Sequence, residues 1–182
     1  GHAGFVLVGI AALSETASTA IILYLVGYSA TTLAAFLCII IYFNLTGREQ
    51  IREFAGMAQQ SPILALALTI SLFSLAGLPF FAGFTVKFYI FTAAAQEGLL
   101  WLVSIAVVNS LISVYYYLMV IKQMYMKPAA GLEQGGGGVT VLKIPLVSMS
   151  LLILLVVVVF FIGVYPSPIV DIIEEATAVL FA

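Results

Sequence analysis

Residues 75–89 read LAGLPFFAGFTVKFY and place one lysine, Lys87, in an otherwise apolar stretch. Pro79 has no backbone N–H to donate and its ring clashes with the preceding turn, so a helix entering this stretch is expected to break. Gly77 and Gly83 let the chain turn there without a steric penalty from a side chain. In hydrocarbon, such irregular backbone survives only where protein buries it or where it lines a wet cavity. The pattern predicts a discontinuous membrane helix.

Lys87 lies ten residues before Glu97, where the next polar residues begin. At about 1.5 Å per residue this is about 15 Å, or half of a hydrocarbon core of roughly 30 Å, so the lysine belongs near the membrane midplane. An ammonium group there costs about 2.5–3.5 kcal/mol on insertion scales. A buried lysine can also gain and lose a proton near neutral pH. Lys87 is therefore a candidate proton relay, and the alternative is a structural lysine that pairs with a carboxylate or reaches toward the interface.

The composition of the 182 residues is 64% hydrophobic and only 8% charged, whereas soluble domains carry about 25% charged residues. The chain is therefore expected to be an all-α integral membrane protein, folded as a multi-span helical bundle. A lone cysteine, Cys38, excludes a disulfide within the chain. The sequence has no C-x-x-C motif, histidine pair or carboxylate cluster of metal-ligand spacing. We expect no metal, haem or iron–sulfur cluster in this chain, and no nucleic-acid partner.

Polar clusters separate the apolar runs into spans. Together these spans are expected to form one membrane domain, residues 1–182. The chain begins without methionine and looks like a piece of something longer, starting midway along a helix. Residues 44–60 are expected to form a short surface helix or loop, and Gly135 to Gly138 make the later loop flexible. The remaining expected elements are a partial span at 1–13, a span at 17–43, the broken span at 61–97, a span at 99–121, a loop at 122–143, a span at 144–164 and an interfacial helix at 167–181.

The charges are unequally divided between the two sides of this arrangement. Counting spans, the loops at 44–60 and 122–143 fall on one side and carry five of the six basic residues: Arg48, Arg52, Lys122, Lys127 and Lys143. The opposite side has acidic residues and no lysine or arginine: Glu15, Glu97, Asp171, Glu174 and Glu175. By the positive-inside rule the basic side is cytoplasmic, or its matrix or stromal equivalent, and the C-terminal tail is on the outer side.

Further polar residues lie within the expected spans. A histidine titrates near physiological pH, so His2 is a possible second proton relay, and the alternative is a satisfied packing residue. For Ser74, Asn109 and Ser113 the preferred interpretation is hydrogen bonding between helices, and for Tyr115 to Tyr117 it is an aromatic belt at the membrane surface. The candidates for a polar path are Tyr28, Thr31, Ser74, Thr85, Asn109 and Tyr116.

Four stretches carry a resemblance to a known family. SLAGLPFFAGFTVKFYIF (74–91) and VVNSLISVYYYLMVIKQMY (107–125) closely resemble the C-terminal half of the antiporter-like membrane subunit N, or subunit 2, of respiratory complex I. HAGFVLVGI (2–10) and LYLVGYSATTLAAF (23–36) are similar to earlier segments of the same family. The resemblance covers essentially the whole chain. It implies the C-terminal part of an antiporter-like fold built from inverted repeats.

The resemblance further implies a proton-conducting subunit without a redox centre of its own. Partner subunits would hold NAD, FMN, iron–sulfur clusters and quinone, and would carry electrons from NADH, or from ferredoxin in photosynthetic relatives, to the quinone. The implied partners are the other membrane-arm subunits, including sister antiporter-like subunits, in the lipid bilayer of a bacterial plasma membrane or of its mitochondrial inner or thylakoid equivalent.

By the same resemblance, Lys87 maps onto the family's lysine in the discontinuous helix, and His2 onto a histidine on its central polar axis. Thr85 and Val86 stand where a glycine-containing pair is common in the family, and the family's glutamate–lysine pair and further central lysine are absent from this chain.

The function predicted from these residues is a proton-translocating subunit of an NADH:quinone oxidoreductase, with protons relayed through Lys87. Two alternatives stay open. A subunit of a multisubunit cation/proton antiporter would use the same lysine chemistry without a redox partner. A purely structural membrane-arm subunit would use its polar residues for assembly alone.

Overall fold

The computed structural model describes residues 1–127 and 141–181, and within these residues all regular structure is helical. The expected flexibility of Gly135 to Gly138 lies outside the described residues. The elements are α1 (His2–Ala12), α2 (Glu15–Thr46), η1 (Ile51–Phe54), α3 (Met57–Gln60), α4 (Pro62–Ala76), α5 (Ala82–Gln96), α6 (Leu100–Met126), α7 (Leu146–Val164) and α8 (Ser167–Phe181).

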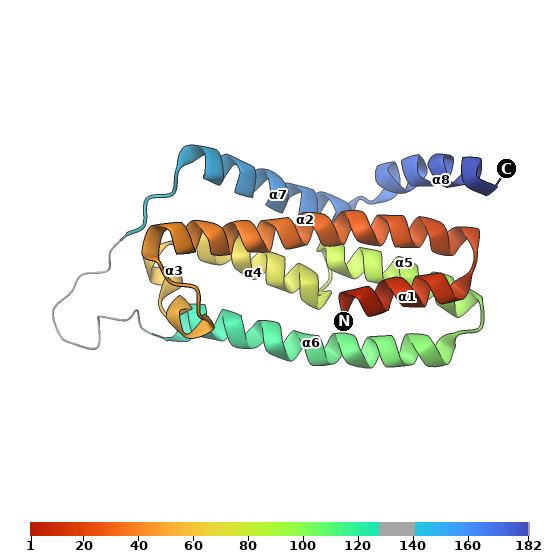
Figure 1. The fold of residues 1–182 in the computed structure, drawn as a ribbon, viewed down its shortest axis with the longest axis horizontal. Coiled ribbons are helices and arrows are strands. Elements are labelled where there is room, and N and C mark those ends of the chain that lie inside the picture. Colours follow the sequence, from red (N-terminus) through yellow and green to blue (C-terminus); the bar gives the residue numbers. More distant parts are fainter. Residues whose placement is uncertain (128–140, 182) are drawn as a thin grey trace.

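Helix α2 is the centre of the bundle and packs against α1, α4, α5, α7 and α8 (Figure 1). It begins where the Ser14 hydroxyl accepts a hydrogen bond from the Ala17 N–H at 3.2 Å, which satisfies one of the free donors of the first turn. It ends at Gly47, whose φ of 70° is a left-handed conformation that glycine adopts without strain. The helix therefore extends beyond the expected span 17–43 at both ends.

Helices α4 and α5 follow one another as the two halves of a discontinuous helix, which confirms the predicted break (Figure 1). Helix α4 ends at Gly77, which has a φ of 86° and donates its N–H to the carbonyls of Phe73 and Ser74. Phe80, within the break, has a φ of 74°, a conformation that is rare for a bulky residue. Helix α7 closes over it, since a side chain on Gly163 would collide with the Phe80 carbonyl. Protein thus buries the irregular backbone from one side.

The segment that follows α2 and the end of α6 meet at one end of the bundle (Figure 1). The Gln123 amide donates to the Arg52 carbonyl at 3.0 Å, and the Leu142 N–H donates to the Gln60 carbonyl at 3.0 Å. The α1–α2 and α5–α6 turns lie at the other end (Figure 1). Helices α4 and α5 together therefore cross the bundle once, and the described parts of the two basic loops share an end.

Within the described residues, three helices are long and apolar enough to cross a membrane, namely α2, α6 and α7, and α1 and α4 are shorter apolar helices. The stretch 44–60 holds η1 and α3, anchored by the buried side chains of Phe54 and Met57. At the opposite end, α8 packs on the start of α2, where the hydroxyls of Thr19 and Thr177 hydrogen-bond at 3.2 Å. The protein is an all-helical, multi-span membrane protein.

Candidate functional site

Lys87, on the second turn of α5, is only 5% exposed, and its ammonium lies in the gap between the two half-helices. Its Nζ donates to the carbonyls of Leu75 at 2.9 Å and Ala76 at 3.2 Å, and to the Ser110 hydroxyl of α6 at 3.0 Å. A protonated lysine has three N–H donors. Each of them has an acceptor here, so the geometry matches the charged form of the side chain.

The break in the helix supplies these acceptors. The last carbonyls of any α-helix lack a partner within the helix and carry a partial negative charge of about half an elementary unit. Leu75 and Ala76 are the last two residues of α4, so the lysine neutralises the end of the first half-helix. The Phe5 ring of α1 makes a cation–π contact with the ammonium, with its centroid 5.0 Å from Nζ. A cation is thus stabilised at mid-bundle by neutral groups.

A second polar cluster surrounds His2 at the start of α1. Its Nδ1 lies 2.8 Å from the Tyr24 hydroxyl and its Nε2 lies 3.2 Å from the Tyr117 hydroxyl. The Tyr28 ring packs against the imidazole with centroids 4.7 Å apart. In the neutral imidazole one ring nitrogen donates a hydrogen bond and the other accepts one. One tyrosine hydroxyl therefore accepts a hydrogen bond from His2, and the other donates one to it. The ring therefore connects hydroxyls on two different helices, α2 and α6.

Lys87 and His2 line the same cavity of about 10 Å³, together with Tyr24, Tyr28 and Thr31 of α2. A cavity needs roughly 10–15 Å³ to hold one water molecule, which must also find two to four polar partners. The cavity is at the lower limit of that size, and an ammonium, an imidazole and hydroxyls line it. One water is the most that the space between the lysine and the histidine can hold.

Thr31 and Ser74, two residues of the predicted polar path, hold the two half-helices and α2 together at the break. Thr31 donates its hydroxyl proton to the Gly27 carbonyl at 2.8 Å, so its bond of 2.9 Å with Ser74 is one that Ser74 donates. The Ser74 hydroxyl also accepts the Gly83 N–H at 3.0 Å, which satisfies a free donor in the first turn of α5. Both hydroxyl protons are therefore committed, and the bonds of the Ser74 hydroxyl join α2, α4 and α5.

Thr85 points away from Lys87, since its hydroxyl donates to the Gly163 carbonyl of α7 at 2.8 Å. Its neighbour Val86 packs closely against α2, where a Cβ on Gly27 would lie 2.7 Å from a Val86 methyl. The small residue that close packing needs is therefore on α2, opposite the valine.

Asn109 and Tyr116 line a cavity that His2 also borders and Lys87 does not. Phe5 and Tyr117 also line this cavity, which has a volume of about 220 Å³ and lies between the start of α1 and α6. Tyr116 is 61% exposed, whereas Tyr117 is half-buried against the histidine. A belt at the membrane surface therefore does not account for Tyr117.

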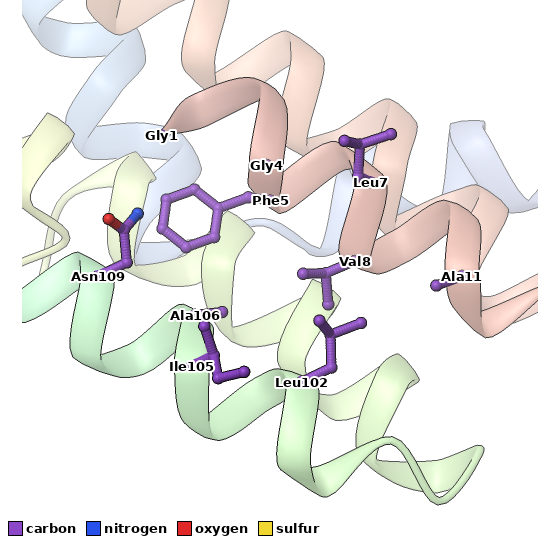
Figure 2. Close-up of a pocket in the computed structure, with 10 residues that line it drawn as sticks. All are labelled: Gly1, Gly4, Phe5, Leu7, Val8, Ala11, Leu102, Ile105, Ala106 and Asn109. Atoms are coloured by element: carbon purple, nitrogen blue, oxygen red, sulfur yellow. The ribbon is translucent and has the colours of Figure 1, made fainter.

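A larger cavity of about 460 Å³ lies beside this one, again between α1 and α6. Figure 2 shows that Phe5 and Asn109 stand at one end of it, and that the remaining labelled side chains are aliphatic or absent. Asn109 is the one lining residue with a polar side chain. This cavity carries no group that could move a proton.

Three contacts of the site were not anticipated from the sequence: Ser110 on Lys87, and Tyr24 and Tyr117 on His2. The spacing of Asn109, Ser113 and Tyr117 by four residues places Tyr117 on a polar face of α6, so periodicity favoured it over Tyr116. Ser110 lies three residues before Ser113, which was the available signal for it. Among the described residues, no three His, Cys, Asp or Glu side chains gather in a way that could hold a metal ion.

The fold and the site define a class of protein: an integral membrane helical bundle with a discontinuous helix and a lysine buried at its break. Residues 1–113 match the family described as NADH:quinone oxidoreductase/Mrp antiporter, transmembrane part. The chain belongs to this family, and within it to the antiporter-like subunits N and 2, as the resemblance predicted.

Two relatives show how much of the family's sequence the chain represents. It is 46% identical to the NAD(P)H-quinone oxidoreductase subunit 2 of Gloeothece citriformis over 127 residues, which are 70% of this chain and 25% of that protein. It is 37% identical to the NADH-quinone oxidoreductase subunit N of Dehalococcoides mccartyi over 184 aligned positions, covering 98% of this chain and 36% of the relative. The chain thus spans about a quarter to a third of the length of these relatives.

Solved structures share the fold at low sequence identity. A chain of the Mrp complex from Dietzia sp. DQ12-45-1b superposes with a TM-score of 0.82 at 22% identity, over 97% of this chain and 40% of that one. A chain of respiratory complex I from Thermus thermophilus with bound NADH superposes with a TM-score of 0.77 at 23% identity, over all of this chain and 38% of that one. Both likenesses concern the arrangement of the helices.

Proposed function

We propose that the chain is part of a proton-translocating membrane subunit of an NADH:quinone oxidoreductase, and that Lys87 is its proton relay. The single observation that carries the proposal is the position of the Lys87 ammonium, buried at the helix break on the free carbonyls of α4. A cation held by neutral acceptors alone is stabilised without a fixed carboxylate partner. Such a group can release its proton without leaving an unpaired buried carboxylate behind.

The relay would connect Lys87 to His2 across the small cavity that both residues line. A water there would accept a proton from the ammonium and pass one to the Tyr24 hydroxyl, which lines the same cavity and would give its own proton to Nδ1 of His2. The histidine can take a proton on one ring nitrogen and give one from the other, toward Tyr117 and the cavity of about 220 Å³ beside it. In this scheme Ser110 is a positioning residue, because it acts by holding Nζ. Thr31, Ser74 and Thr85 hold the helices and transfer no proton.

The partners follow from the names of the relatives, which are subunits of quinone oxidoreductases. NAD, FMN, iron–sulfur clusters and quinone would be held by other subunits, and sister antiporter-like subunits would adjoin this one in the membrane arm. The basic end of the bundle would face the cytoplasm, matrix or stroma, which places the C-terminal tail on the outer side of a bacterial plasma membrane or its organellar equivalent.

The test is made on the intact complex in sealed vesicles, with proton uptake and quinone reduction recorded together. Wild type is compared with Lys87→Met, Lys87→Arg and a control, Lys143→Met, which removes an exposed lysine at the basic end. Assembly of each variant is measured first. We expect Lys87→Met to lower proton uptake per electron and the control to behave as wild type.

Arginine separates the relay from a structural role. It keeps a positive charge at the end of α4 but does not release its proton. Under the proposal Lys87→Arg translocates fewer protons than wild type although it assembles. If arginine restores full pumping where methionine does not, the lysine is only a cap on α4, and the relay is refuted.

The alternative function is that of a cation/proton antiporter subunit, since the matched family includes the Mrp antiporters. The same vesicles distinguish the two. Proton movement that needs quinone reduction supports the oxidoreductase subunit. Proton movement driven by a sodium gradient without electron transfer would replace it with the antiporter.

A further inference from the structure

The end of α6 carries a cavity that the proton site does not use. It has a volume of about 410 Å³ and lies at the basic end of the bundle, remote from Lys87. Three apolar or aromatic side chains and three polar ones line it: Tyr115, Leu118, Met119, Lys122, Gln123 and Lys127.

The apolar part of the lining follows one face of the helix. Tyr115, Leu118, Met119 and Lys122 are spaced by three and four residues, as neighbours on one helix face are. The first three are 63%, 46% and 53% exposed, although they lie in a membrane-spanning helix. From Tyr115 to Lys122 the lining covers seven residues of helix, or about 10 Å at about 1.5 Å per residue, which fits within one leaflet of a hydrocarbon core of roughly 30 Å. The exposed lining below the lysine therefore lies at the depth of the acyl chains of one leaflet.

The polar part of the lining is positive. Lys122 and Lys127 contribute two ammonium groups, and the six lining residues, all of which the structure describes, include no carboxylate. Gln123 donates its amide to the Arg52 carbonyl, which ties this end of α6 to a second basic segment. An uncharged protein segment would leave the two ammonium groups uncompensated. The charge thus favours an occupant with an anionic head and an apolar tail.

We propose that this cavity binds an anionic phospholipid. The lipid phosphate lies between the ammonium groups of Lys122 and Lys127, and an acyl chain covers Leu118, Met119 and the Tyr115 ring. Basic clusters at the ends of membrane helices attract anionic lipids, each lysine near the surface contributing a factor of about five in affinity. The site is independent of the proton relay, so the failure of one leaves the other standing.

The first experiment uses the complete membrane assembly that contains this chain, reconstituted in two kinds of vesicle. One is phosphatidylcholine alone, and the other is phosphatidylcholine with phosphatidylglycerol. A photoreactive phosphatidylglycerol should label the α6 peptide that contains Tyr115 to Lys122, and the labelling should fall at high salt because the attraction is electrostatic. Equal labelling by photoreactive phosphatidylcholine, or cross-linking of this peptide to another protein segment, would overturn the proposal.

The second experiment counts the lipids that the purified assembly retains, by native mass spectrometry. The double variant Lys122→Gln/Lys127→Gln should bind phosphatidylglycerol about 25-fold more weakly, two factors of five. Lys143→Gln makes the same change of charge at an exposed lysine outside the cavity and should retain lipid as wild type does. The double arginine variant should also retain it. Undiminished retention by the double glutamine variant would refute the site.

Discussion

Replacing Gly83 by alanine tests the contact that joins the two half-helices. Gly83 lies in the first turn of α5, and a Cβ on it would collide with the Ser74 carbonyl oxygen in the last turn of α4. The obstacle is backbone, which cannot rotate away as a side chain can. The substitution can therefore be accommodated only if the ends of α4 and α5 move apart.

The expected effect is a net loss of stability. In an unobstructed helix, exchanging glycine for alanine stabilises by roughly 0.5–1 kcal/mol, because glycine loses more conformational freedom on folding. Overpacking a close contact costs typically about 1–3 kcal/mol, and a backbone obstacle belongs at the upper end. The difference is a destabilisation of about 2 kcal/mol. It also moves the carbonyls of Leu75 and Ala76 relative to Nζ of Lys87, so proton uptake should fall with it.

The assay is thermal unfolding of the complete membrane protein in detergent, followed by size-exclusion chromatography after heating. Gly4→Ala is the matched control, since it makes the same change in a helix where a Cβ would meet nothing within 4 Å. We expect the control to unfold at the wild-type temperature or above it, and Gly83→Ala to unfold below it. If the two variants are equally stable, the close approach of α4 and α5 is wrong, and with it the account of how the lysine acquires its carbonyl acceptors.

Three further variants test the site. Ser110→Ala removes one of the three acceptors of the Lys87 ammonium, at a cost of about 1.5–3 kcal/mol for a hydrogen bond to a charged group; in the sealed vesicles proton uptake per electron should fall, whereas Ser113→Ala, whose hydroxyl bonds only within α6, should change little. Tyr117→Phe deletes the hydroxyl next to His2 and should slow proton uptake more than Tyr116→Phe does; equal rates would remove the His2–Tyr117 bond from the relay. Thr85→Val breaks the bond to Gly163 and should lower thermal stability by about 1 kcal/mol with pumping unchanged, and a pumping defect in a stable Thr85→Val protein would place Thr85 on the path.

The sequence by itself determined the class of fold, because the relevant physics is local. Pro79 removes a backbone hydrogen bond and clashes with the preceding turn, Gly77 lets the chain turn there, and the observed break lies at these residues. The prediction of an all-helical membrane bundle with one discontinuous helix is confirmed. The family was also correctly identified from short stretches, including the one around Lys87. The end of the bundle at which each charge lies followed from counting spans.

Only the tertiary structure decided which side chains meet. The spacing of Asn109, Ser113 and Tyr117 marks a polar face of α6, but the membrane helices are apolar overall, so hydropathy does not tell which helix that face meets. That rotation brings Tyr117, and not Tyr116, to His2, and it brings Ser110 to Lys87. In the same way, Tyr24 bonds His2 while Tyr28 only packs against its ring.

The partner of the buried lysine is the clearest case of this division. Burial of Lys87 followed from its place in an apolar stretch, and an acidic partner was one structural alternative. The structure pairs it with the free carbonyls at the end of α4, which no residue type in the sequence encodes. They exist because the helix stops eleven residues before Lys87, and they reach Nζ because the first turn of α5 lies against the last turn of α4. A helix break can be seen in a sequence, but the charge that it attracts is decided by packing.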